Sequence, residues 1–124
     1  MKQHVIESWL TLLHLDFVVQ VRGLKALHDI VRRQPVRTRS SNDPASELLC
    51  RSMDYACVLY FKQVLCLQRS AATTLLLRRY GWDAQMVIGA QIVPLKSHAW
   101  VEIGGTIAND KPYMLDIYQI LERC

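Results

Sequence analysis

The chain has 124 residues, of which 51% are hydrophobic and 21% charged, so it can bury one core as a single globular domain. Its net charge of +4 is mild, and a nucleic-acid-binding protein would show a clustered basic face instead. No run of 18 apolar residues exists, so we expect no membrane span. The apolar run from Leu10 to Val21 predicts a buried amphipathic helix; a helix lying on a membrane surface is the less favoured alternative.

Four cysteines lie at positions 50, 57, 66 and 124, and none belong to a Cys-x-x-Cys pair. Because that spacing and the usual histidine motifs are missing, we expect no metal and no cofactor. Glu7 and Asp16 interrupt the segment after Lys2, which is not typical of a secretory signal. We therefore expect a cytoplasmic protein with free thiols.

The first part of the chain predicts helices. Apolar side chains recur at steps of three, four or seven over residues 4–33, and Gly23 predicts either a kink or a break into two helices. The histidines at 4, 14 and 28 on this element are expected to be surface or packing residues. Prolines and polar residues predict a loop over 34–44, in which Arg37 and Arg39 are solvated.

Two more helices are predicted before residue 81. One begins near Pro44 with Asp43 as its N-cap, and its apolar face includes Cys50 and Cys57. The next runs from about Cys66 to Tyr80 and ends at Gly81, which suits a helix C-terminus. We place the break between these two helices at residues 63–65.

The composition then changes to that of a β-sheet. Strands are predicted over Ala84–Val93, Ser97–Ile103 and Thr106–Asp110, with a hairpin turn at Gly104-Gly105 and a further strand at Tyr113–Tyr118. Helices followed by a short antiparallel meander define an α+β fold. We treat residues 1–124 as one domain, with an N-terminal helical part and linker over 1–40 and a core over 44–124.

Cys66 and His98 are the strongest candidates for chemistry. A cysteine at a helix start faces free backbone N–H groups and the positive end of the helix dipole, which favour the reactive thiolate. His98 is the only histidine in the β half. A cysteine and a histidine far apart in sequence are typical of a nucleophile and its base, although either residue alone is more often structural.

A catalytic histidine is usually oriented by a third residue. The length of the hairpin loop determines which aspartate can face His98. A two-residue loop at Gly104-Gly105 places Ala99 opposite Asp110, whereas a three-residue loop places His98 opposite Asp110. We predict the three-residue loop or a bulge, and prefer Asp110 to Asp116.

The residues also resemble a known family as a set. Cys-Leu-x-Arg-Ser from Cys66, Leu-Leu-x-Arg-x-Gly ending at Gly81, Val-Ile-Gly-Ala from Val87 and His-Ala-Trp-Val-Glu from His98 are similar to the leader peptidases of lasso-peptide biosynthesis. These peptidases belong to the transglutaminase-like, papain-related cysteine proteases. The resemblance runs from about residue 48 to the end of the chain.

The resemblance implies a transglutaminase-like core and cleavage of a lasso precursor peptide between leader and core. It implies Cys66, His98 and Asp110 as the catalytic residues, a small leader-recognition protein and an ATP-dependent lasso cyclase as partners, and no nucleic acid. Papain-like enzymes use a glutamine for the oxyanion; Gln63 is too close to Cys66 in sequence, so we prefer the backbone N–H of Cys66. Another acyl transfer on the same residues and a non-catalytic peptide-binding module remain as alternatives.

Overall fold

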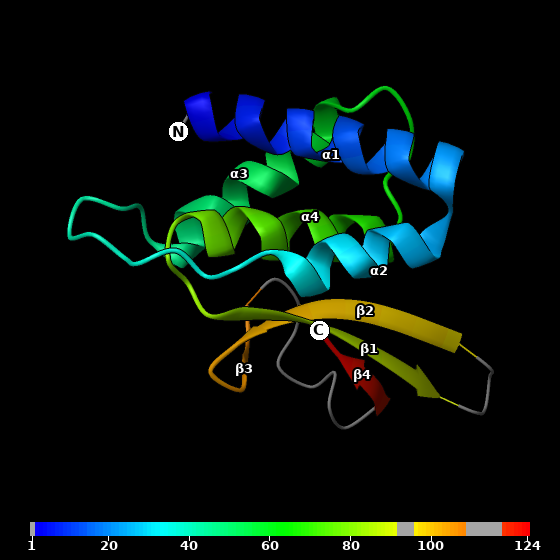
Figure 1. The fold of residues 1–124 in the computed structure, drawn as a ribbon. Helices are drawn as coiled ribbons and strands as arrows, with labels where there is room; N and C mark the ends of the chain where they lie inside the picture. The colour runs from blue at the N-terminus through cyan, green and yellow to red at the C-terminus, as the bar shows by residue number, and fades with distance from the viewer. Residues whose placement is uncertain (1, 92–95, 109–117) are drawn as a thin grey trace.

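The computed structural model describes residues 2–91, 96–108 and 118–124. In these ranges the helices are α1 (Lys2–Arg22), α2 (Leu24–Arg33), α3 (Ser46–Leu59) and α4 (Cys66–Arg79). The strands are β1 (Ala84–Gln91), β2 (Lys96–Ile103), β3 (Thr106–Ile107) and β4 (Gln119–Arg123). The order of helices first and strands second confirms the predicted α+β fold (Figure 1).

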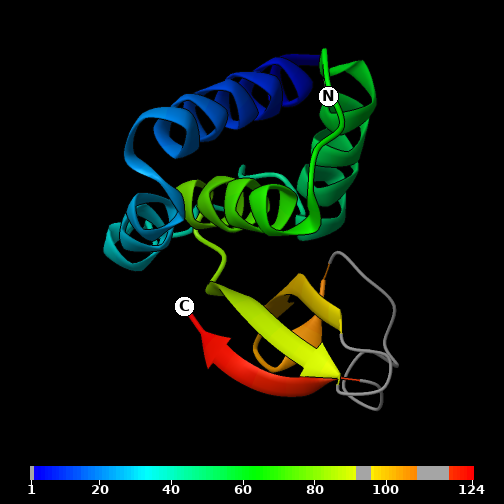
Figure 2. The ribbon, with the colours of Figure 1, turned by 90° about the vertical axis from the view of Figure 1, so that its right-hand side faces the viewer.

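The helices cover one face of the sheet. Helices α2 and α4 lie next to the strands, and α1 and α3 lie farther out, as the view turned by 90° also shows (Figure 2). Helix α4 is the centre of the molecule because its residues from Ser70 to Arg78 are all buried. A helix that is buried on nearly every side packs against several elements at once. Among the described helices, none is long and apolar enough to cross a bilayer.

A buried arginine ties the helices to the sheet. Arg78 donates hydrogen bonds to the backbone carbonyls of Ala84 and Cys124, each at 2.9 Å, and to those of Gln34 and Val31. Burial lowers the pKa of Arg78 from its ordinary value. These bonds join the end of α4 to α2, β1 and β4, so they hold the helical layer at a fixed place on the sheet.

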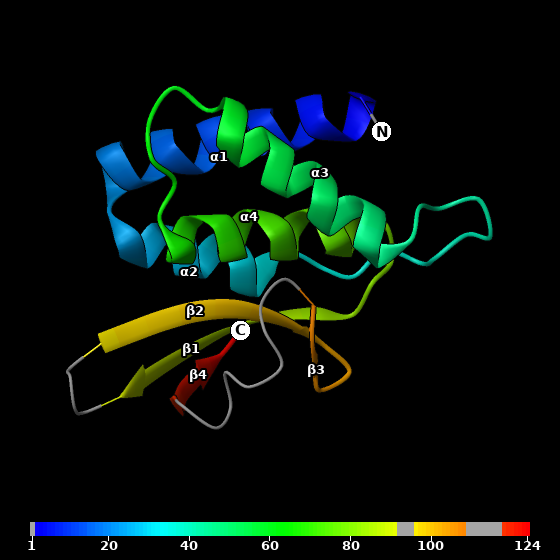
Figure 3. The ribbon, with the colours of Figure 1, turned by 180° about the vertical axis from the view of Figure 1, so that it is seen from behind.

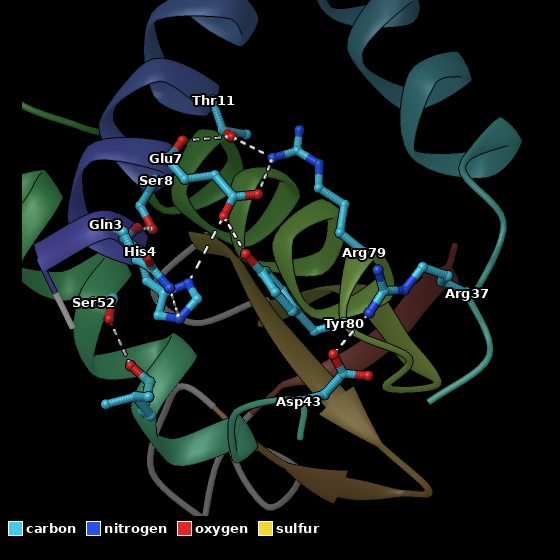
Figure 4. Close-up of polar contacts among 11 residues, drawn as sticks. Gln3, His4, Glu7, Ser8, Thr11, Arg37, Asp43, Ser52, Arg79 and Tyr80 are labelled. Carbon is cyan, nitrogen blue, oxygen red and sulfur yellow. Dashed lines mark hydrogen bonds and ion pairs between the residues drawn. The ribbon is translucent and has the colours of Figure 1, made fainter. Parts of the chain in front are cut away.

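A second polar cluster fastens α1 to the end of α4 (Figure 4). Glu7 accepts hydrogen bonds from the Tyr80 hydroxyl at 2.6 Å and from Arg79 at 3.2 Å. Arg79 also donates to the Thr11 hydroxyl at 2.9 Å, and the His4 ring lies edge-on to Tyr80. Burial and the bond to Glu7 raise the pKa of Tyr80 to about 12. The phenol is therefore a stable hydrogen-bond donor in this contact.

Of two predicted helix boundaries, one is confirmed and one is wrong. Gly23, with φ of 83°, separates α1 from α2, so the break is confirmed and the single kinked helix is not. Helix α3 begins at Ser46 after Ala45, so the predicted N-cap at Asp43 is wrong. The Asp43 carboxylate instead accepts bonds from the Ser40 N–H and from Arg37, which closes a turn in the preceding loop.

The sheet has the order β3-β2-β1-β4 and is antiparallel throughout. The predicted meander is confirmed for β1, β2 and β3, but the last strand pairs with β1 rather than with β3. That strand is Gln119–Arg123, whereas we predicted Tyr113–Tyr118; Tyr118 precedes the strand, and residues 113–117 lie outside the described residues. This non-local pairing brings the end of the chain beside β1.

The hairpin between β2 and β3 has a two-residue loop. Ile103 pairs with Thr106, and Glu102 pairs with Ile107. Gly104 and Gly105 have φ of 57° and 84°, the left-handed values that a type I′ turn requires at both positions. The predicted three-residue loop is therefore wrong, and β3 is shorter than predicted.

Candidate active site

Cys66 is the first residue of α4, as the sequence predicted. Helix α3 ends at Leu59, and Leu65, at φ of −77° and ψ of 156°, precedes α4 with no side-chain cap. The first backbone bond of the helix joins the Arg69 N–H to the Leu65 carbonyl. The N–H groups before it have no partner within the helix, so they and the helix dipole favour a negative charge at Cys66. The predicted break between the helices is confirmed.

The other thiols lie in environments that suppress reactivity. All four cysteines are free, as predicted. Burial raises the pKa of Cys50 to about 11 and the pKa of Cys57 to about 11. Burial and the neighbouring Glu122 carboxylate also raise the pKa of Cys124. Because the thiolate is the nucleophile, these three thiols are poorly reactive at neutral pH.

A small cavity brings Cys66 and His98 to one place. Its volume is about 90 Å³, and its walls are Cys66 and Leu67 of α4, Ile88 of β1, and Ser97, His98 and Ala99 of β2. The helix start and the histidine strand, 32 positions apart in sequence, therefore meet where we expected a nucleophile and its base. The walls are mainly apolar, so a charge that forms at Cys66 is poorly screened there.

The imidazole ring itself lies on the other face of the sheet. Ala99 and Val101 pair with Ile88 and Met86, and Val101 and Met86 pack in the helical core. Side chains alternate along a strand, so His98 points away from α4. Its ring stacks with Trp100 at 6.1 Å and with Tyr118 at 5.5 Å between ring centroids. His98 is thus one of the residues of the cavity wall, but its imidazole ring packs against Trp100 and Tyr118.

Gly89 makes room for these aromatic rings. It lies opposite His98 on β1, and a Cβ atom there would be 2.7 Å from the Trp100 ring and 2.9 Å from Tyr118. Such approaches are shorter than carbon atoms tolerate. Only glycine therefore fits between the strands at this point.

The Trp100 ring is held in turn by a buried carboxylate. Glu102, 3% exposed, accepts a hydrogen bond from the Trp100 indole N–H at 3.0 Å. Its other oxygen lies 3.4 Å from the Arg123 guanidinium of β4. The motif His-Ala-Trp-Val-Glu therefore places His98, Trp100 and Glu102 on one face of β2, where each contacts the next.

The third predicted site residue, Asp110, lies outside the described residues, as does its alternative Asp116. The register that supported Asp110 is not the one observed. The Ala108 N–H donates to the Val101 carbonyl at 2.8 Å, which continues the two-residue-loop register beyond β3. The hairpin thus gives no argument that Asp110 faces His98. Gln63 is exposed and is not part of the cavity wall.

One group of side chains in the described ranges has the composition of metal ligands. His28 of α2, Glu122 of β4 and Cys124, the residue after β4, place their ligand atoms within 4.8 Å of one another. Arg32 already forms an ion pair with the Glu122 carboxylate, and the Cys124 thiol donates to the same carboxylate. The group is therefore internally paired, and it lies apart from the Cys66 cavity walls.

Sequence reasoning missed the aromatic partners of His98. The position of Trp100 two residues further along the same strand was an available signal, because such residues share a face. Tyr118 gave no comparable signal, since it reaches His98 only through the pairing of β4 with β1.

Comparisons with known proteins agree with the fold and with the motifs. Over 56 residues the chain is 41% identical to the microcin J25-processing protein McjB of Escherichia coli; the match covers 45% of this chain and 27% of that protein. No solved structure matches significantly. A model of the transglutaminase-like superfamily matches residues 9–123, nearly the whole chain. The chain therefore belongs to the transglutaminase-like superfamily.

Proposed function

We propose that the protein is a cysteine peptidase that removes the leader from a lasso-peptide precursor. The observation that carries this proposal is the position of Cys66, at an uncapped helix start and on the wall of a cavity shared with His98. The similarity to a protein whose name describes processing of microcin J25 supplies the substrate class.

In the proposed reaction the Cys66 thiolate attacks the scissile carbonyl after His98 takes the thiol proton. The backbone N–H groups at the start of α4 stabilise the oxyanion of the tetrahedral intermediate. The His98 imidazolium then protonates the departing amine of the core peptide. Water hydrolyses the thioester, which releases the leader as an acid and restores the thiol. Asp110 holds the imidazole in the tautomer that accepts the proton.

This reaction includes a rearrangement of β2. The His98 ring starts from its stack with Trp100 and Tyr118, on the sheet face away from α4. Proton transfer requires hydrogen-bond distance between the imidazole and Sγ of Cys66. We therefore propose that residues 96–98 change their pairing or twist when the precursor is bound, which turns the ring into the cavity. A leader-recognition protein that presents the precursor, and a cyclase that uses the released core, complete the proposed set of partners.

The stacked position of His98 also favours a second candidate function. A protein that binds the precursor without cutting it needs no imidazole at Cys66, and the described arrangement suits that role. A different acyl transfer by the same residues is the third candidate. The three differ in their products: an intact peptide, a cleaved leader acid, or a leader joined to another amine.

Mass spectrometry of the products separates these candidates. Wild-type protein, precursor and recognition protein are mixed, and we expect a leader with a free carboxyl end. Cys66→Ala should release none, whereas Cys57→Ala, which removes a half-buried thiol of raised pKa, should release the leader at the wild-type rate. Intact precursor with wild-type protein, or equal release by Cys66→Ala, would contradict the peptidase proposal.

A further inference from the structure

Three side chains that can bind a metal ion meet where the end of β4 lies beside α2. His28 belongs to α2, Glu122 belongs to β4, and Cys124 follows that strand. Figures 1 and 2, and Figure 3 from behind, show this end of the chain next to α2. The expectation of no metal rested on local motifs, which residues 94 positions apart, such as His28 and Glu122, do not form.

The spacing of the ligand atoms is close to that of a tetrahedral zinc site. Zinc binds nitrogen, oxygen and sulfur at about 2.0–2.3 Å, so neighbouring ligand atoms around it lie about 3.3–3.8 Å apart. Here Nδ1 of His28 is 3.7 Å from Oε2 of Glu122, and Sγ of Cys124 is 3.3 Å from Oε1 of the same carboxylate. With one atom from each residue, all three lie within 4.8 Å, so the site has to contract by about 1 Å at most. The Glu122 side chain is 31% exposed and has room to rotate.

The backbone around the site is held in place by other bonds. Cys124 and Met86 of β1 exchange backbone hydrogen bonds of 2.8 and 3.0 Å, and Arg78 donates to the Cys124 carbonyl at 2.9 Å. Glu122 and Cys124 are two positions apart on an extended segment, so their side chains project to the same side. His28 lies within a regular helix. Ligands on fixed segments bind an ion with little loss of conformational entropy.

The charges of the ligands match those of a divalent ion. The Glu122 carboxylate and a Cys124 thiolate cancel the two charges of Zn²⁺, and the neutral imidazole of His28 adds none. Arg32 competes with the ion, because its guanidinium forms an ion pair with Glu122. The Arg32 side chain is 54% exposed and also lies 4.0 Å from Asp29, so it can exchange one carboxylate for the other. An exposed ion pair contributes little to stability, whereas coordination of zinc by a thiolate contributes far more.

We propose that His28, Glu122 and Cys124 bind one Zn²⁺ ion, with a water molecule in the fourth position. The Cys124 thiol releases its proton to solvent as the zinc–sulfur bond forms, and nothing is oxidised or reduced. Mixed nitrogen, oxygen and sulfur donors suit zinc, whereas magnesium and calcium prefer oxygen alone. The ion joins α2 directly to the last strand of the sheet. The three ligands are not on the walls of the Cys66 cavity, so the site does not depend on the proposed peptidase activity.

Cobalt provides a spectroscopic test in the full chain, with the thiols kept reduced by a phosphine. A thiolate bound to Co²⁺ gives a charge-transfer band in the near ultraviolet, and we expect this band with one Co²⁺ per chain and its loss when Zn²⁺ is added. Cys124→Ser should abolish the band and weaken zinc binding in calorimetry by at least about tenfold, the effect that even an indirect partner of a zinc ligand can have. Cys66→Ala is the matched control and should retain both. Circular dichroism of each metal-free variant checks the fold, and His28→Gln, with the same expected loss, replaces Cys124→Ser if the serine variant does not fold.

Arg32→Ala distinguishes a metal site from a packing contact. Removal of the guanidinium frees the Glu122 carboxylate, so the affinity for zinc should rise by about two- to fivefold, the value of an exposed ion pair. Because an ion that binds only the folded chain raises its melting temperature, zinc should raise that of wild type and Arg32→Ala but not that of Cys124→Ser.

Three results would overturn the proposal. The first is a wild-type protein that binds no zinc at millimolar concentration. The second is a charge-transfer band that survives in Cys124→Ser or is lost in Cys66→Ala, since the metal would then be bound by another thiol. The third is a lower affinity for zinc in Arg32→Ala, which would show that the ion does not take the place of the guanidinium at Glu122.

Discussion

The candidate site has two halves, the start of α4 and the hairpin of β2 and β3. They differ in whether nearby or distant residues set the positions of their side chains. Cys66 is at the helix start, where the sequence placed it, with the backbone N–H groups available. The hairpin has a different register from the one predicted, and the His98 ring packs with Trp100 and Tyr118. A helix boundary depends on a few neighbouring residues, whereas a strand face depends on the parity of its loop and on distant strands. The position of Cys66, the proposed nucleophile, is therefore fixed locally, and that of His98, its proposed base, is set by tertiary contacts.

The strand half gives the largest expected effect. His98→Ala should lower leader release by about 10³-fold, because the thiol loses the base that activates it and the acid that protonates the amine. His14→Ala, at an exposed histidine of α1 away from the cavity, is the matched control and should retain wild-type release. Timed mass spectrometry of the released leader measures both. Equal rates of leader release for His98→Ala and wild type would contradict the proposal that His98 takes part in the reaction of Cys66.

The proposed orienting carboxylate, that of Asp110, gives the next largest expected effect. Asp110→Asn should reduce leader release by about 10²-fold or more, because an amide cannot stabilise an imidazolium as a carboxylate does. Asp116→Asn should leave the rate unchanged. If the two variants exchange their effects, Asp116 is the orienting residue, and the sequence argument that preferred Asp110 is wrong.

The aromatic packing around His98 gives a smaller effect, on stability. Gly89→Ala forces a Cβ atom into the Trp100 ring and Tyr118, so Trp100, which is fully buried, has to shift. Such overpacking typically lowers the free energy of unfolding by about 1–3 kcal/mol. Urea denaturation followed by tryptophan fluorescence measures the change. An unaltered midpoint would show that the strands and rings have more room than the structure describes.

Most features that nearby residues determine were predicted correctly, whereas those that depend on distant strands were not. Helical periodicity, Gly23 and the change of composition after Gly81 predicted the helices and the first strands, because these signals act over a few residues. The pairing of β4 with β1 was missed, since no local signal shows which strand is the neighbour of a C-terminal strand. The two glycines of the hairpin favour a type I′ turn on local grounds, whereas the requirement that His98 face Asp110 favoured the longer loop, which is not the one observed.

The candidate site divides in the same way. The start of α4 at Cys66 was predicted from local signals, and the predicted proximity of Cys66 and His98 agrees with the small cavity whose walls include both residues. The outward direction of the imidazole does not, because it depends on Gly89, Trp100 and Tyr118 from three different segments. These contacts define what the proposed rearrangement of residues 96–98 has to break.

The most direct test of the account is the rate at which iodoacetamide alkylates Cys66 in wild type and in His98→Ala, measured by peptide mass spectrometry at neutral pH. In wild type we predict that Cys66 reacts first. The pKa of Cys50 and that of Cys57 are raised from 9.0 to about 11. At neutral pH, which is below both values, each of these residues therefore has about a hundredfold smaller thiolate fraction than an ordinary thiol.

With the leader peptide and the recognition protein bound, we predict that alkylation of Cys66 is about tenfold slower in His98→Ala than in wild type, because binding turns the wild-type His98 ring into the cavity and an ordinary thiol is only a few per cent thiolate at this pH. Without them the two proteins should react alike, because the His98 ring is stacked with Trp100 and Tyr118 on the other face of the sheet. The labelling of Cys50 and Cys57 should stay the same, which shows that the fold is intact. An equal Cys66 rate in wild type and His98→Ala with the leader peptide and the recognition protein bound would contradict the claim that Cys66 and His98 act together.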